Sequence, residues 1–157
     1  MKKRRAIFLC LTLAVVVLVG LGLLRGRPAK TKWPQVLKNG DHTVTLDVVT
    51  REVCNEEIYF LTGTLIFEGY TLEEVPDFRQ FPLTLSFNGV TENFGQWGQI
   101  GRTIKNGELT RLIQDFSAHI NGYSGLGEDD LISLSVEGFD GAFTFTAGEL
   151  PQVPHEW

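Results

Sequence analysis

The length, composition and charge of the chain set the first limits on its structure and function. Its 157 residues, 43% of them hydrophobic, suffice for one domain around one core. Eight of the 14 Lys and Arg residues precede Trp33, whereas all 19 Asp and Glu residues follow it. The part from Trp33 onward therefore has six basic and 19 acidic residues, a net charge of −13. Because this charge repels phosphates, we expect no nucleic-acid partner; it suits either a partner with a basic surface or a merely soluble domain.

An apolar segment, residues 6–24, predicts a single transmembrane helix. Its 19 residues carry no charge and span about 28 Å as a helix, close to the thickness of a bilayer's hydrocarbon core. Four basic residues precede it in a short tail, residues 1–5, and four follow it in or near a basic stem, residues 25–35. The counts are equal, but the first cluster abuts the apolar segment and Trp33 lies where an interfacial aromatic residue would. We therefore expect a signal-anchor with the large domain outside the cytoplasm.

A cleaved signal peptide, followed by secretion, is the alternative interpretation of the same segment. Gly20 and Gly22 provide small residues for cleavage after a basic start. The apolar segment is longer than the roughly 7–15 residues of a typical signal peptide, which favours a retained anchor that binds the membrane through residues 6–24.

Residues 36–150 predict an α+β domain, a mainly antiparallel sheet with one amphipathic helix packed on it, and residues 151–157 predict a flexible tail. Period-two alternation or continuous apolar character indicates the strands. The expected strands are residues 42–49, 57–68, 83–88, 90–94, 131–139 and 142–147. Asn88-Gly89 and Asp140-Gly141 are hairpin turn sequences, and a two-residue turn at the second would place Val136 opposite Phe145 and Leu134 opposite Ala147.

Residues 108–120 predict the single helix of the domain. Its apolar residues fall on one helical stripe: Leu109, Leu112, Ile113, Phe116 and Ile120. Asn106 suits the start of a helix and Asn121-Gly122 its end. Since the polar face is not basic, we expect this helix to pack on the sheet rather than on a membrane.

Two loops supply candidate binding residues. The glycine-rich segment 95–102 contains Trp97, Gln96 and Gln99, a plausible contact surface, although Trp97 also suits a cap on the core. The acidic loop 125–130 adds Asp129 and Asp130, which also suit a solvated turn.

No motif for a metal, a nucleotide or a catalytic nucleophile is present in the sequence, so we expect no cofactor and no catalytic residue. Cys54 is the only cysteine after the apolar segment, which leaves a buried thiol or an intermolecular bridge. The function we expect is that of a membrane-anchored, non-catalytic module that binds another protein. The alternatives are a tethered hydrolase that uses His42 or His119 with a carboxylate, and a structural spacer.

Overall fold

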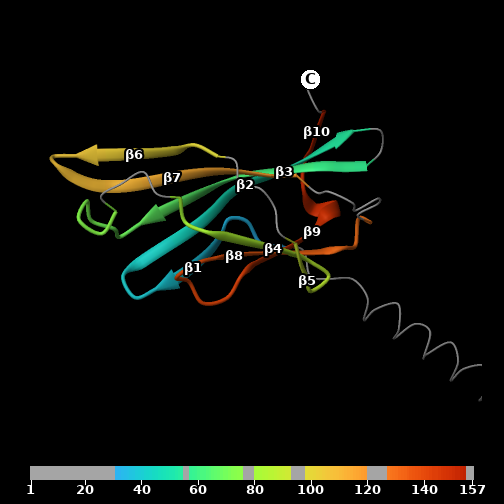
Figure 1. Cartoon of the computed structure of the whole chain (residues 1–157), viewed down its shortest axis with the longest axis horizontal. Helices are drawn as coiled ribbons and strands as arrows, with labels where there is room; N and C mark the ends of the chain where they lie inside the picture. Colours follow the sequence, from blue (N-terminus) through green and yellow to red (C-terminus); the bar gives the residue numbers. More distant parts are fainter. Residues whose placement is uncertain (1–30, 55–56, 76–79, 93–97, 120–126, 155–157) are drawn as a thin grey trace, which may run out of the picture. The chain divides into compact units, whose positions relative to one another are not determined.

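The computed structural model describes residues 31–54, 57–75, 80–92, 98–119 and 127–154 (Figure 1). Residues from Thr31 onward form one unit. Within the described ranges, no helix has the length and apolar character needed to cross a bilayer. The predicted anchor, residues 6–24, lies outside these ranges.

The strands form two sheets (Figure 1), and buried apolar side chains from both sheets form one core. The strands are β1 (Gln35–Asn39), β2 (His42–Cys54), β3 (Glu57–Glu68), β4 (Leu83–Phe87), β5 (Val90–Glu92), β6 (Ile100–Lys105), β7 (Glu108–His119), β8 (Leu131–Val136), β9 (Phe143–Thr146) and β10 (Gln152–Pro154), with a 3-10 helix, η1 (Ala147–Glu149), before β10. Sheet A has the order β1-β2-β3-β7-β6, with β10 parallel to β2, and sheet B has the order β5-β4-β8-β9. All other pairs are antiparallel. Because the two sheets share one core, the domain is a β-sandwich.

The core lies between the sheets because side chains alternate between the two faces of each strand. Sheet A contributes Leu46, Leu61, Leu65, Phe67 and Leu112, and sheet B contributes Phe87, Ile132, Leu134, Phe143 and Phe145, all essentially inaccessible to solvent. Each such side chain stabilises the fold by about 1.5–3 kcal/mol relative to an exposed one. Phe67 also stacks on Phe81, with ring centroids 4.1 Å apart, which fixes the loop before β4 to sheet A.

The expected helix at residues 108–120 is wrong, and with it the α+β class. Residues Glu108–His119 form β7, a 12-residue strand between β3 and β6. Its buried residues alternate along the strand: Leu112, Gln114, Phe116 and Ala118. A buried glutamine interrupts the apolar alternation expected of a strand, while Ile113 on the opposite face completes an apparent helical stripe.

The start of β7 shows a second reason for the error. Asn106 and Gly107 have φ values of 55° and 84° and join β6 to β7 in a two-residue turn. Positive φ at both central residues is the signature of a hairpin turn, for which Asn-Gly is the preferred sequence. Asn106 therefore reverses the chain rather than starting a helix.

The two predicted hairpins of sheet B differ in outcome. The turn at Asn88-Gly89 is confirmed, because Phe87 pairs with Val90 across it. The register expected around Asp140-Gly141 is wrong by four residues, since Leu134 pairs with Phe143 rather than with Ala147. The connection is longer than two residues, and its Phe139 is drawn into the core with 8% exposure. An even shift keeps every inward residue facing inward, so the apolar pattern alone did not reveal it.

Both ends of the described chain are attached to the sandwich. Trp33, expected at a membrane interface, is half-buried and lies 5.6 Å from Phe145, ring to ring. Thr31 donates its backbone N–H and its hydroxyl to Glu149 of η1. At the other end, β10 pairs with residues 51–53 of β2, within the segment expected to be a flexible tail.

Candidate functional site

The outward face of sheet A carries a groove of about 370 Å³ over β2, β3 and β7. Its lining includes four hydroxyl side chains, those of Thr50, Thr62, Thr64 and Ser117. Val48, which is 49% exposed, adds an apolar surface. The groove therefore combines a hydrogen-bonding wall with an apolar patch, as ligand sites commonly do.

Gly63 of β3 also lines the groove, and it has no room for a side chain on its inward face. A Cβ atom there would lie 2.6 Å from the ring of Phe116, the residue opposite it in β7, and 2.7 Å from the carbonyl oxygen of Val48. The register between β2 and β3 shifts between Leu46 and Val48, which brings this carbonyl close. Backbone and ring occupy the space of a side chain, so only glycine fits.

The strand register arranges the polar side chains in two rows. Val48, Thr64 and Asp115 form one row, and Thr50, Thr62 and Ser117 form the next. The Thr50 and Thr62 hydroxyl oxygens are 2.7 Å apart, and the Thr64 hydroxyl donates to Asp115 Oδ1 at 2.8 Å. These cross-strand hydrogen bonds orient both rows. Within the described ranges, Asp115 Oδ2 and the Ser117 hydroxyl have no hydrogen bond and remain available to a ligand.

Gly98 and Gln99 form the rim of the groove next to β6. The Asp115 N–H donates to the Gln99 carbonyl at 3.0 Å, and Gln80 Nε2 donates to the Gly98 carbonyl at 2.7 Å. A Cβ atom at position 98 would lie 1.6 Å from the Asp115 carbonyl oxygen, so the close approach again requires glycine. The structure thus places one sequence-predicted contact residue, Gln99, at the groove with its side chain exposed. Gln96 and Trp97 lie outside the described residues.

The acidic candidates lie elsewhere and are absent from the groove lining that the structure describes. Asp130 Oδ1 accepts from Asn88 Nδ2 at 2.9 Å, and Oδ2 accepts from the Gly127 N–H at 2.7 Å. The bond from Asn88 and then that from Gly127 lower the pKa of Asp130. Asp130 therefore fixes a turn beside the β4–β5 hairpin, while Asp129 is exposed.

His42 has an acidic neighbour, as the hydrolase alternative requires. Its Nε2 lies 3.4 Å from Glu74 Oε1, and its ring stacks on Tyr70 at 4.0 Å. The Thr71 N–H and hydroxyl donate to Glu74 Oε2 at 2.8 and 2.9 Å, and these bonds, the backbone one first, lower the pKa of Glu74. Since hydroxyl and imidazole bind the same carboxylate, the imidazole does not stand between a nucleophile and an acid. The arrangement clamps the loop after β3. Burial, and then the Glu74 charge, raise the pKa of Tyr70 beside it.

The sequence prediction missed most of the groove. A helix at residues 108–120 has Asp115 and Ser117 outside its apolar stripe, so the sequence does not predict their alignment with Thr64 and Thr62. A signal that could have found part of it is the pair of hydroxyl residues at alternate positions, Thr62 and Thr64, within the predicted strand 57–68. No group of three or more His, Cys, Asp or Glu side chains that could hold a metal ion occurs within the described ranges.

Comparisons with protein-family models, curated proteins and solved structures found no match to this chain. The geometry itself defines a class, a β-sandwich with a hydroxyl-lined groove on one outward sheet face. The groove lies on regular strands, which hold its side chains more rigidly than a loop would.

Proposed function

We propose that the chain is a membrane-anchored, non-catalytic binding protein whose β-sandwich contacts another protein outside the cytoplasm. The groove on sheet A is the contact site. The observation that carries this proposal is the position of Gln99, a candidate chosen from the sequence, on the rim of the groove. Gly98 connects the rim directly to the segment that contains Trp97, the candidate with the largest contact area.

The chemistry of the groove supports binding rather than catalysis. Among its described lining residues, Asp115 is the single titratable side chain. General acid–base catalysis commonly needs two titratable groups, or one together with an activated nucleophile. Hydroxyl and amide groups on a rigid sheet instead suit hydrogen bonds to a peptide.

The anchor and the orientation in this proposal depend on residues 1–33 of the sequence. A 19-residue uncharged segment after a basic tail favours a retained helix that tethers the domain. The net charge of −13 favours a partner with a basic surface.

The test is affinity purification of the tagged full-length chain from detergent-extracted membranes, with mass spectrometry of the captured proteins. Trp97→Ala and Gln99→Ala should each reduce capture of the same protein severalfold, with Tm within about 2 °C of wild type. Val90→Ala is the matched control, because Val90 is 55% exposed on sheet B and absent from the described groove lining. A large fall in Tm for Trp97→Ala would assign Trp97 to the core, and undiminished capture by both variants would refute the proposal.

A tethered hydrolase that uses His42 is the second candidate, favoured by the 3.4 Å contact with Glu74. It predicts hydrolytic activity of the purified chain that His42→Gln abolishes without loss of fold. Activity unaffected by this substitution would eliminate it.

A further inference from the structure

Asp115 is the single charged side chain among the described residues that line the groove on sheet A. The side chain is exposed, and Thr64 occupies only one of its two carboxylate oxygens. The backbone N–H of Asp115 donates to Gln99 on the rim, so the carboxylate stands on a strand that is held on both sides. A fixed carboxylate with one available oxygen is a strong acceptor for a cationic donor.

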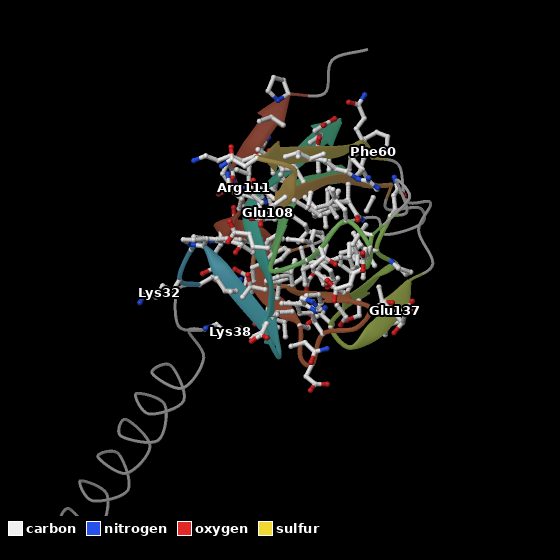
Figure 2. All side chains as sticks on the ribbon, turned by 90° about the vertical axis from the view of Figure 1, so that its left-hand side faces the viewer. Lys32, Lys38, Phe60, Glu108, Arg111 and Glu137 are labelled. Atoms are coloured by element: carbon white, nitrogen blue, oxygen red, sulfur yellow. The ribbon has the colours of Figure 1, made fainter. Side chains whose placement is uncertain are left out.

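Among the ion pairs that join described residues, none involves the Asp115 carboxylate. Arg111 is the basic residue on the same face of β7, four residues from Asp115 and about 13 Å away along the strand. Its guanidinium lies 3.4 Å from Glu68 Oε1, and Figure 2 shows Arg111 near Glu108, the first residue of β7. The domain as a whole carries a charge of −13, so the groove has a negative potential that attracts cations.

The remaining lining suits a peptide that carries a long basic side chain. Val48 offers an apolar surface for the methylene groups of such a side chain. The Ser117 hydroxyl and the exposed Gln99 side chain are available for hydrogen bonds to peptide groups. A volume of about 370 Å³ accommodates one side chain of this kind with its flanking peptide units.

We infer that the groove binds an extended segment of the partner protein through a lysine side chain whose ammonium group pairs with Asp115. This inference rests on the proposed function and specifies the partner's chemistry. Lysine is favoured over arginine because a single carboxylate oxygen is available, which matches a compact ammonium group better than a two-pronged guanidinium.

The direct test is an NMR titration of the ¹⁵N-labelled full-length chain in neutral detergent micelles with the tripeptide acetyl-Gly-Lys-Gly-amide. We expect shifts of the amide signals of Thr64, Asp115, Ser117 and Gln99, and weaker binding as salt is added. Asp115→Asn keeps an acceptor for Thr64 but removes the charge, and it should weaken binding about tenfold or more. Glu137→Gln removes the same charge from an exposed residue of the β8–β9 connection and should leave the affinity unchanged.

Three results would overturn the inference: equal binding of acetyl-Gly-Gln-Gly-amide, equal binding by Asp115→Asn, or shifts confined to other surfaces. Capture of the native partner separates this inference from the proposed function. Capture that falls with Gln99→Ala but not with Asp115→Asn refutes the lysine contact and leaves the binding function standing. Capture that neither substitution changes refutes both.

Discussion

Gln114 provides the sharpest test of how the two sheets are joined. Its side chain is fully buried, and its Oε1 accepts from the Phe81 N–H at 2.8 Å while its Nε2 donates to the Phe81 carbonyl at 3.0 Å. Gln114→Leu removes both bonds at the start of sheet B. Each buried polar group deprived of a partner costs about 1–3 kcal/mol, and the added apolar surface of leucine offsets part of this. We expect the free energy of unfolding to fall by about 2–4 kcal/mol.

This loss is measurable by urea and thermal denaturation. With an unfolding entropy of about 2.1 cal/mol/K per residue, a domain of about 125 residues should lose about 8–15 °C in Tm. Gln35 is the matched control, because its side chain makes the same two bonds to Thr144, at 2.9 and 3.0 Å, but in contact with solvent. Gln35→Leu should cost only about 1 kcal/mol, since water replaces the lost bonds. A Gln114→Leu variant as stable as Gln35→Leu would refute the reasoning.

Two further predictions concern the packing and the pH dependence of the domain. Gly63→Ala should lower the free energy of unfolding by about 1–3 kcal/mol, because the new Cβ atom would clash with the Phe116 ring and the Val48 carbonyl oxygen. Urea denaturation measures this loss. An unchanged urea midpoint would show that the strands shift to accommodate the methyl group at little cost. For Glu149, partial burial raises the pKa, but bonds from Thr31 and Thr146 outweigh it and lower the pKa to about 2. A lowered folded-state pKa stabilises the domain above the ordinary carboxyl pKa of 4.5, and that stability is lost as the pH falls toward 2. Glu149→Gln should therefore flatten the decline in Tm between pH 4.5 and pH 2, and a decline as steep as that of wild type would contradict this role.

The segments whose structure the sequence predicts correctly are those in which neighbouring residues all favour the same element. Residues 57–68 form a strand with the predicted bounds, because the apolar run and its charged ends coincide. The Asn88-Gly89 turn forms as predicted, because both residues accept positive φ at little cost.

The remaining features depend on partners distant in the sequence. Gln114 is buried because Phe81, 33 residues away, satisfies both of its polar atoms. The β8–β9 register depends on the burial of Phe139, which a two-residue turn would exclude from the core. The groove depends on three strands placing Thr50, Thr62 and Ser117 in one row, which no single segment reveals. Among the predicted contact residues, the structure places Gln99 at this groove and Asp130 in a separate turn.

Site-specific photocrosslinking in intact membranes tests the binding site most directly. The full-length chain would carry benzoylphenylalanine at position 99 on the groove rim or, as a control, at position 90 on sheet B. We predict a discrete crosslinked protein from position 99, absent from position 90 and weakened by Asp115→Asn. Crosslinks from position 90 to the same protein, with none from position 99, would show that the partner binds another face.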